Sequence, residues 1–381
     1  MQMRYRFEDI KKRIDELAEK MGQVTVMEVC GTHTANIHKY GIHELLPGNI
    51  RLVSGPGCPV CVTDQKDIAA ALSLVEHENV IFACFGDMMR VPCGDRSLYS
   101  LYESGKDVRV VTSALDALQI ARDNPDRQTV YFGIGFETTV PQTAALIEAA
   151  DECGIRNLSV LSAHKTMPQA IRQLLGNGSG IDALMCPGHV AAITGAGAFD
   201  FVADELRLPA VVAGFEAYDI MAALLRILYM LQNGERKCVN MYPRAVTRHG
   251  NREALSLIYK VFEPCDAVWR GLGKIKDSGL GIKERYRRFD ALHRFNIRPY
   301  DVKEAKGCIC ASILCGKKTP ADCLNFGREC TPERPLGPCM VSAEGSCAAA
   351  IRYGDTPLQG AFLYGGGMSR VLVRCSIGNG G

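Results

Sequence analysis

Short apolar runs that alternate with helical segments constrain the fold more than any other feature of this sequence. The runs that predict strands are Val24–Val29, Ile50–Ser54, Val80–Phe85, Val108–Val111, Thr129–Gly133, Leu158–Ser162, Ala183–Met185 and Ala210–Ala213. Helical segments such as Asp64–Glu76, Ala114–Arg122, Pro141–Ala150 and Met167–Leu175 lie between several of them. Near-continuous apolar strands that alternate with helices predict parallel sheets covered on both faces.

The strands form two series, which predict an α/β protein with two doubly wound, Rossmann-like parallel-sheet domains. A chain of 381 residues is also too long for one ordinary core. We place these domains at residues 1–125 and 126–233, with one larger sheet as the alternative. The alternation of apolar strands and helices then ends, so a smaller C-terminal domain is expected at 234–381. Within it, Val261–Arg298 is expected to be partly helical.

Charge and hydropathy exclude several functional classes. The net charge of +2 creates no large field that would attract nucleic acid or anionic lipid. The most apolar stretch, Ile220–Leu231, is interrupted by Arg226 and is shorter than the ~20 residues that a membrane helix needs. The charged segment Met1–Lys20 lacks the apolar region of a secretory signal. We therefore expect a cytoplasmic protein with no nucleic-acid or membrane partner.

The chain contains 17 cysteines, and their distribution is uneven. In a large intracellular protein, many cysteines indicate metal-binding or catalytic thiols rather than a disulfide framework. The densest group comprises Cys308, Cys310, Cys315, Cys323, Cys330, Cys339 and Cys347. An iron–sulfur cluster together with a redox-active pair would use six of these thiols. The spacing matches neither a ferredoxin run nor a zinc ribbon, and structural zinc is the rival interpretation.

Chemically active residues also gather where the predicted strands end, which is where open α/β sheets bind ligands. The motifs at these ends are Cys30-Gly31-Thr32-His33-Thr34, Gly55–Cys61, Gly86-Asp87, Gly135–Thr139, Ala163-His164-Lys165 and Pro187-Gly188-His189. They predict a cleft between two α/β units.

Cys30 and His33 form the first candidate site. Cys30 follows a strand and precedes a helix, whose N-terminal amides are expected to stabilise a thiolate. A thiolate with an imidazole suits a borderline-soft metal such as Fe(II) or Zn(II). A buried cysteine beside a hydrogen-bonded histidine is the alternative interpretation.

Cys58 and Cys61 form a CxxC motif after the second strand. This position favours a redox thiol pair, with metal binding and inert packing as alternatives. Among the acids, Asp87, Glu137 and Glu344 are candidate ligands or acid–base groups, although Glu137 is equally consistent with helix capping. His189 is a candidate for the site or a core histidine. The glycine-rich segments lack the lysine of a phosphate-binding loop, so nucleotide binding is not inferred.

Taken together and in order, these motifs resemble those of the HypD family of [NiFe]-hydrogenase maturation proteins. The resemblance also includes Cys323–Phe326, Cys330-Thr331-Pro332, Gly337–Ser342 and Glu344–Cys347 near the C-terminus. It implies a scaffold for assembling the Fe(CN)2CO unit. It also implies a stable complex with HypC, which contributes a cysteine, transient cyanide delivery by HypE, and contact with the hydrogenase large subunit through HypC.

The resemblance further implies a role for individual residues. Cys30 would hold the iron that receives CN and CO, with His33 nearby. Cys308, Cys323, Cys330 and Cys347 would bind a [4Fe-4S] cluster, with Cys310/Cys339 and Cys58/Cys61 as thiol pairs. Asp87, His164, His189 and Glu344 are expected to position or protonate the incoming ligand. Two departures stand out: Ala311 occupies a position where glycine is expected, and Cys315 is an additional thiol and therefore a competing ligand.

Three functions compete on this basis. The first is an assembly scaffold with redox activity rather than a conventional turnover enzyme. The second is a [4Fe-4S]-dependent thiol–disulfide reductase that acts on a protein partner. The third is a zinc-stabilised binding module.

Overall fold

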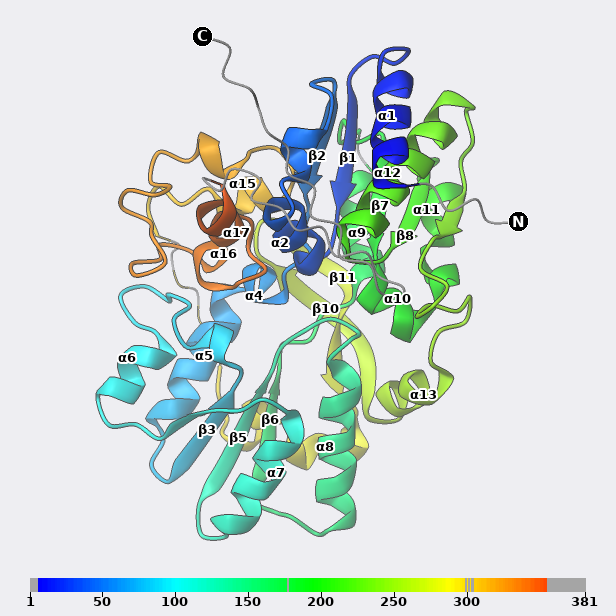
Figure 1. The fold of residues 1–381 in the computed structure, drawn as a ribbon. Coiled ribbons are helices and arrows are strands. Elements are labelled where there is room, and N and C mark those ends of the chain that lie inside the picture. The colour runs from blue at the N-terminus through cyan, green and yellow to red at the C-terminus, as the bar shows by residue number, and fades with distance from the viewer. Residues whose placement is uncertain (1–5, 177, 299, 301, 303–304, 355–381) are drawn as a thin grey trace.

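The computed structural model describes residues 6–176, 178–298, 300, 302 and 305–354, and contains two parallel sheets that lie one above the other in Figure 1. The first is a five-stranded sheet. In spatial order its strands are β2 (Ile50–Ser54), β1 (Val24–Glu28), β7 (Ala183–Pro187), β8 (Ala210–Ala213) and β9 (Cys238–Asn240). Helices α1 (Phe7–Ala18) and α12 (Ala217–Gln232) pack together and bury one face of this sheet.

The second sheet has four parallel strands. In spatial order they are β4 (Val108–Val110), β3 (Val80–Cys84), β5 (Gln128–Gly133) and β6 (Leu158–Ser162). Helices α7 (Ala114–Asp123) and α8 (Val140–Glu152) cover one of its faces. The opposite face packs in a separate core with α5 (Gln65–Glu76), α6 (Leu98–Glu103) and α9 (Met167–Leu175). The expected α/β class with parallel, doubly covered sheets is confirmed.

The strand pairing does not follow the expected division of the chain at residue 125. Every predicted strand is present within a residue or two, but β1 and β2 pair with β7–β9, while β3 and β4 pair with β5 and β6. Residues 1–125 therefore supply strands to both sheets. The chain leaves the first unit after β2, builds the second sheet, and returns at β7, so a division in sequence order does not describe the sheets.

A long hairpin occupies residues that were expected to be partly helical. Strands β10 (Phe262–Trp269) and β11 (Gly273–Ile282) pair antiparallel, so the helical expectation was wrong for this part of Val261–Arg298. Glycines in β11 let its backbone lie close to β10, since a Cβ on Gly279 would lie 2.8 Å from Cβ of Ala267. Only the short helices η3 (Glu284–Phe289) and α14 (Ala291–Arg294) follow. In Figure 1 the hairpin runs between the two sheets.

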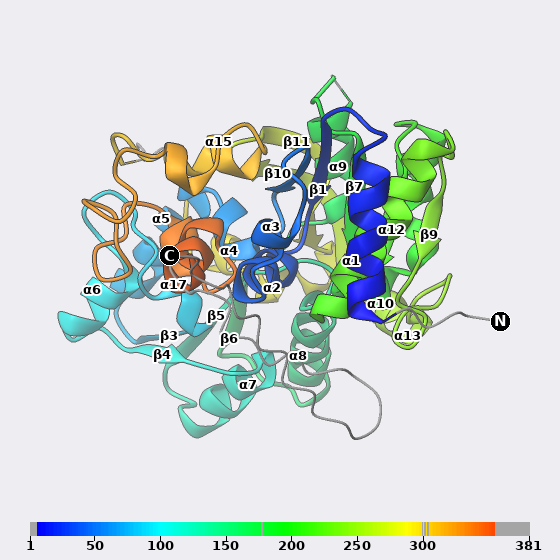
Figure 2. The ribbon, with the colours of Figure 1, turned by 45° about the horizontal axis from the view of Figure 1, so that its top comes forward.

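The cysteine-rich segment is mostly irregular and is tied to the first unit. Its helices are α15 (Cys310–Leu314), η4 (Pro320–Asp322), α16 (Pro338–Val341) and α17 (Ser346–Tyr353). Helix α17 packs against α2 (Gly31–Lys39), and both α15 and α16 contact α4 (Pro59–Val62). Figure 2 shows this segment, in orange, beside α2 and α4. Residues beyond 354, which belong to the expected domain 234–381, lie outside the described residues.

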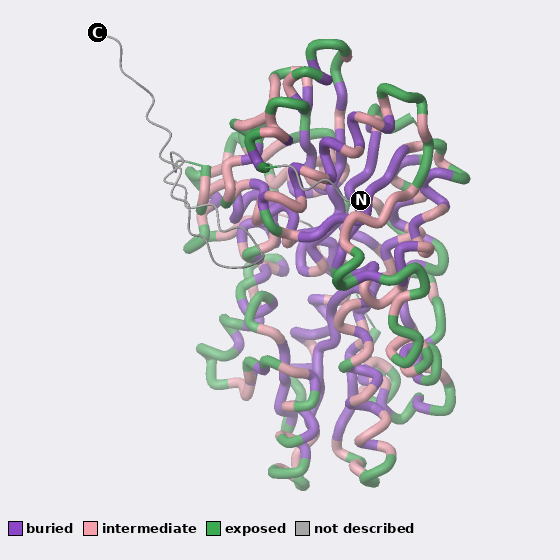
Figure 3. The backbone as a smooth tube through the Cα atoms, turned by 45° about the vertical axis from the view of Figure 1, so that its right-hand side comes forward, coloured by how far each residue is buried: buried purple, intermediate pink, exposed green. Residues whose placement is uncertain are grey.

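The remaining helices lie in the connections between strands. They are α3 (Ile42–Leu45), η1 (Gly86–Met88), α10 (Gly188–Thr194), η2 (Ala196–Phe199), α11 (Asp200–Asp204) and α13 (Arg252–Val261). Figure 3 shows that much of the inner backbone is buried, whereas the outer turns are exposed. No helix in the described part of the chain is long and apolar enough to cross a membrane.

Candidate functional site

Cys30 lies between the carboxyl end of β1 and the first turn of α2, where two loops meet. The amide of Gly31 donates to the carbonyl of Gly57 at 2.9 Å, and the amide of Thr34 donates to the carbonyl of Cys30 at 3.0 Å. A Cβ on Gly57 would lie 2.2 Å from the nitrogen of Cys30. The loop that follows β2 therefore packs directly on the backbone of Cys30, next to Cys58 in the sequence.

The environment of the Cys30 thiol differs from the expected one. The amides of His33 and Thr32 donate to its sulfur and lower its pKa, as expected at a helix N-terminus. Burial and the nearby carboxyl group of Glu344 outweigh them, so the pKa of Cys30 rises to about 12. The helix N-terminus therefore does not lower the pKa of this thiol as expected, because burial has the larger effect.

Glu28 is a residue of this site that the sequence analysis missed. Its carboxylate accepts hydrogen bonds from the amide of Cys30 at 2.9 Å and from the hydroxyl of Thr34 at 2.5 Å. Burial raises the pKa of this carboxyl to about 7. The available signal was an acidic side chain inside an otherwise apolar strand, immediately before the Cys30 motif.

His33 is fully buried, and one of its ring nitrogens presents a free lone pair. Its Nε2 lies 2.8 Å from the carbonyl oxygen of Gly214, which can only accept, so Nε2 carries the hydrogen. Burial lowers the pKa of His33 to about 4, so the ring is neutral near pH 7. Its Nδ1 therefore presents a lone pair, and no hydrogen-bond partner for it exists among the described residues.

His189 lies beside His33 but in a different environment. The rings of His33 and His189 both contact Phe215, with centroid separations of 4.8 and 3.8 Å. The side chain of His189 is exposed to solvent, but the protein around it removes enough water to lower its pKa. We call the connection between β1 and α2, which contains Cys30, the Cys30 loop. The end of β7 thus brings His189 to the edge of this loop, as its position in the sequence suggested.

Asp87 and Glu344 both accept hydrogen bonds from hydroxyl groups, and Glu344 thereby contacts the loop that contains Cys30. Ser342 donates to Asp87 at 2.8 Å, and Thr32 donates to Glu344 at 2.7 Å. The Cβ of Glu344 packs so closely on Gly31 that a side chain at position 31 would collide with it. Burial raises the pKa of Glu344, and the charge of Asp87 raises it further. These contacts join the loops after β1 and β3 to the C-terminal segment.

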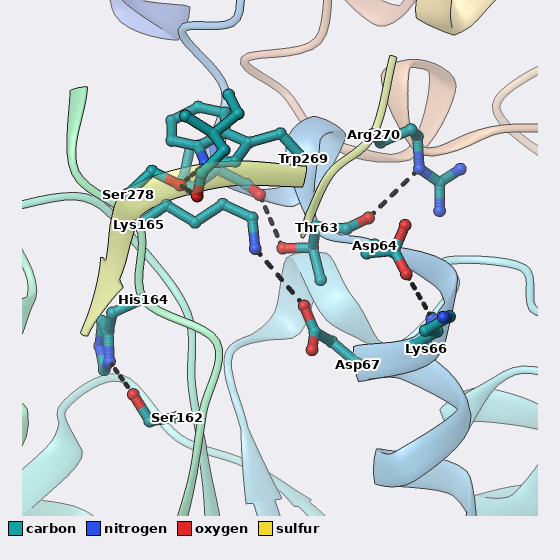
Figure 4. Close-up of polar contacts among 12 residues, drawn as sticks. Thr63, Asp64, Lys66, Asp67, Ser162, His164, Lys165, Trp269, Arg270 and Ser278 are labelled. Carbon is teal, nitrogen blue, oxygen red and sulfur yellow. Dashed lines mark hydrogen bonds and ion pairs between the residues drawn. The ribbon is translucent and has the colours of Figure 1, made fainter. Parts of the chain in front are cut away.

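Cys58 and Cys61 form a disulfide across the first turn of α4, with their Cα atoms 5.2 Å apart. The amide of Cys61 donates to the sulfur of Cys58 at 3.2 Å, which closes the turn. The next residues are held as well. Thr63 donates to the carbonyl of Pro59, and Figure 4 shows Nε of Arg270 donating to the carbonyl of Thr63. The turn of the hairpin therefore supports the residues that follow the disulfide.

A small cavity of about 10 Å³ lies inside the cysteine-rich segment. The cysteines that line it are Cys308, Cys310, Cys323, Cys330 and Cys347. Gly337 packs on two of their sulfurs, since a Cβ there would lie 2.6 Å from Sγ of Cys308 and 2.8 Å from Sγ of Cys310. The amide of Leu336 donates to the sulfur of Cys330 at 3.3 Å. The four cysteines expected to bind a cluster therefore share one cavity.

Cys310 is the centre of the thiol contacts at this cavity. Hydrogen bonds from the thiols of Cys308, Cys339 and Cys347 lower the pKa of Cys310 well below its usual value. Donation to Cys310 correspondingly raises the pKa values of Cys308 and Cys347. Cys339 does not line the cavity but is fully buried against Cys310. The expected Cys310/Cys339 pair is thus in contact.

Cys315 lies apart from the other cysteines of this segment. Its thiol donates to the carbonyl of Gly271 at 3.4 Å, and it does not line the cavity. Gly271 also packs closely on Ala311, where a Cβ would lie 2.9 Å from Cα of Ala311. The two departures from the family pattern therefore face the hairpin rather than the cavity.

The donor set at the cavity is of the kind that iron–sulfur clusters take. Five cysteines line an apolar space, and thiolates are the ligands of such clusters. Zinc instead needs its ligands gathered at about 2.0–2.3 Å from one point. In the portion of the chain that the structure describes, no three His, Cys, Asp or Glu side chains are grouped in that way.

His164 and Glu137 serve the fold rather than the Cys30 loop. His164 is buried between the hydroxyls of Thr143 and Ser162, at 3.2 and 3.1 Å, and burial lowers its pKa to about 3. Figure 4 shows the ring turned toward Ser162 and away from Lys165, which pairs with Asp67. Glu137 accepts from the amide of Met167 at the start of α9, rather than capping the helix that follows it in the sequence.

Comparison with known proteins places these motifs in one family. A family model described as "HypD: Hydrogenase formation hypA family" matches residues 6–354. The hydrogenase maturation factor HypD of Rhodobacter capsulatus is 42% identical over 352 residues, covering 90% of this chain and 93% of its own length. The HypD proteins of Azotobacter vinelandii and Cupriavidus necator are 42% and 43% identical, covering 90% and 88% of this chain and 92% of their own lengths.

Proposed function

This chain belongs to the HypD family of hydrogenase maturation factors, and we propose that it acts as the scaffold on which the Fe(CN)2CO unit is assembled. The iron is cargo in this proposal, and Cys30 is its anchor. The protein is thus a scaffold with redox activity rather than a conventional turnover enzyme.

The Cys30 loop offers the iron two ligands of suitable chemistry. Cys30 provides a soft sulfur, and His33 provides the open Nδ1 lone pair of a ring that burial keeps neutral. Only two ligands come from this chain, which leaves positions for a cysteine of HypC and for the incoming cyanide and carbon monoxide. HypC forms the stable partner, HypE delivers cyanide transiently, and HypC carries the product to the hydrogenase large subunit.

Side chains at the rim of the loop are suited to orient these small ligands. His189 is exposed next to Phe215, and Asp87 and Glu344 are held by the hydroxyls of Ser342 and Thr32. Because burial raises its pKa, Glu344 retains a proton more readily than an exposed carboxyl group. We assign His189 to positioning and Glu344 to proton donation, with Asp87 fixing the segment that carries Glu344.

The cysteine-lined cavity would hold a [4Fe-4S] cluster through Cys308, Cys323, Cys330 and Cys347. When bound, this group supplies single-electron reduction. Cys310 and Cys339 form the neighbouring dithiol, and the lowered pKa of Cys310 favours the thiolate that attacks a disulfide. Exchange with Cys58–Cys61 would leave Cys310 and Cys339 oxidised and Cys58 and Cys61 reduced.

The adjacency of three segments carries this proposal. Gly57 places the disulfide turn against the backbone of Cys30, and α4 contacts the helices that bear Cys310 and Cys339. Cys58, Cys61, Cys310 and Cys339 also share one buried cluster with Cys330 and Cys347. A continuous path of sulfur-bearing segments therefore connects the cavity to the Cys30 loop.

A substitution at Cys30 tests the iron assignment. The Cys30→Ala variant, purified without oxygen in complex with HypC, should lose the infrared bands of bound CN and CO because their iron has lost its anchor. Its visible absorption from the cluster should stay at the wild-type level, since Cys30 does not line the cavity. Persistence of the CN and CO bands in this variant would refute the assignment.

A thiol–disulfide reductase is the second candidate, favoured by the disulfide that lies beside the cysteine cavity. Such an enzyme would need Cys58 and Cys61 but not Cys30. Turnover of a disulfide-bonded protein substrate by the Cys30→Ala variant, without HypC, would support the reductase. Absence of turnover by the wild-type protein would support the scaffold.

A further inference from the structure

Glu28 is a buried acid whose hydrogen bonds converge on the Cys30 loop. It lies at the end of β1 with 1% of its surface exposed. An acidic group in such a place is costly unless its oxygens are satisfied. Here one oxygen accepts from the amide of Cys30, the other accepts from the hydroxyl of Thr34, and Ser54 donates as well.

These partners belong to three separate segments of the loop region. Cys30 begins the turn, Thr34 lies one turn into α2, and Ser54 ends β2. The backbone carbonyl of Glu28 also accepts from the amide of Gly55 at 2.7 Å. One residue therefore connects the loop after β1, the first turn of α2 and the loop after β2.

This arrangement also holds the backbone at the start of α2. Cys30 occupies the position before the first helical residue, and the amides of Thr32 and His33 face its sulfur. How the sulfur meets these amides depends on how the backbone of Cys30 is held. Glu28 holds the nitrogen of Cys30, and Thr34 holds its carbonyl.

We propose that Glu28 is a positioning residue that fixes Cys30 in the orientation in which its sulfur binds iron. This inference rests on the proposed function and extends it to a second residue. A carboxylate suits the role because it only accepts, and both donors face it. Glutamine has the same size, but its NH2 group would meet one of the two donors and leave that donor unpaired.

The test uses cobalt(II) as a probe of the Cys30 site in the cluster-loaded protein under anaerobic conditions. Thiolate-to-cobalt charge-transfer absorption, corrected with the Cys30→Ala variant, reports binding at Cys30 itself. Glu28→Gln should weaken this binding about 10- to 100-fold, the range for losing a residue that orients a metal ligand. The charge-transfer band should also move, which a merely structural role would not cause.

Matched variants separate positioning from general disturbance. Thr34→Ser keeps the hydroxyl that donates to Glu28 and should bind cobalt like the wild type, whereas Thr34→Val should bind it more weakly. Glu44→Gln removes an exposed acid of α3 and should change nothing. Wild-type cobalt affinity with an unshifted band in Glu28→Gln would overturn the inference.

A second measurement tests the positioning role of Glu28 without any metal. Alkylation of Cys30 by iodoacetamide, followed by mass spectrometry, should become about tenfold faster in Glu28→Gln, as expected when a hydrogen bond to a charged acceptor is lost. An unchanged alkylation rate would count against positioning. Equal cobalt binding by the wild type and Cys30→Ala would instead refute the iron site of the proposed function.

Discussion

Burial shifts the pKa values of individual residues near the Cys30 loop and in the second sheet. His33 and His164 are held neutral because a charged ring would lose its hydration, which lowers both pKa values. The same effect acts in the opposite direction on Glu28, whose carboxyl is raised to about 7. At the residue scale, burial thus disfavours the charged forms of these side chains.

The pH dependence of stability should reveal the buried histidine of the second sheet. Below its ordinary pKa of about 6.5, His164 takes up a proton in the unfolded chain but not in the folded one. Its contribution to stability is therefore present above about pH 6.5 and is lost as the pH falls toward the folded value. In His164→Gln that loss should be absent.

Urea unfolding followed by the fluorescence of Trp269 measures this effect. The stability difference between wild type and His164→Gln should shrink from about pH 7.5 to about pH 5.5, by at most about 1.4 kcal/mol per pH unit. His293→Gln, at an exposed position, serves as the control and should show a constant difference. A constant difference for His164→Gln as well would contradict the assignment of a neutral buried ring.

The extra thiol of the C-terminal segment should be dispensable for the cluster. Cys315 donates to Gly271 outside the cavity, whereas Cys347 lines it. Cys315→Ser should therefore retain the iron and sulfide content of the reconstituted wild type, while Cys347→Ser should lose most of both. Metal and sulfide analysis with visible absorption checks this, and a cluster that fails to form in Cys315→Ser would place that thiol among the ligands.

At the scale of elements, glycines determine how closely the functional segments approach one another. Gly57 brings the turn before α4 against Cys30, Gly31 admits Glu344, and Gly337 leaves room beside Cys308 and Cys310. In each case a Cβ would come within 3 Å of its neighbour, a separation that requires something to shift. The close approach of strand-end loops and the C-terminal segment is thus built into the backbone.

The Gly337→Ala variant tests whether the close approach at Gly337 is needed at the cavity. The added methyl would overlap the sulfurs of Cys308 and Cys310, so the cluster should form poorly or with a shortened lifetime in air. Gly22→Ala is the control, since a Cβ there meets nothing within 4 Å. The ratio of cluster absorption to protein absorption after anaerobic reconstitution measures the effect, and equal ratios for both variants would show that the space at Gly337 is not needed.

The strands of the two sheets were predictable from sequence, whereas their pairing was not. Runs such as Ile50–Ser54 and Leu158–Ser162 are near-continuously apolar because both of their faces are covered, and this local pattern marks their ends closely. Which strands become neighbours depends on contacts between distant segments, as when β1 pairs with β7. The hairpin at 262–282 lacked the strict alternation that predicts a strand.

The candidate site was predictable in its residue types but not in its contacts. The positions of Cys30, Asp87 and His189 after strands predicted that they gather near the sheet edges. The links through Ser342 and Thr32 join residues more than 250 positions apart, and no local pattern encodes them. Glu28 was overlooked because a single acid in a strand carries no motif.

At the scale of the whole molecule, the C-terminal segment holds the two units in one functional arrangement. It packs on α2 through α17 and on α4 through α15 and α16, and Ser342 reaches Asp87 after the first strand of the second sheet. The segment that contains the cysteine cavity therefore contacts both the disulfide turn and the helix that follows Cys30. The central claim is that iron at Cys30 is chemically separate from iron in the cavity.

Mössbauer spectroscopy of protein that was produced on iron-57 and purified with HypC tests that claim most directly. We expect a cluster signal together with a low-spin mononuclear Fe(II) signal in the wild type. Cys30→Ala should lose only the mononuclear signal, because the cavity ligands are intact. Retention of the mononuclear signal in Cys30→Ala would show that Cys30 does not hold this iron.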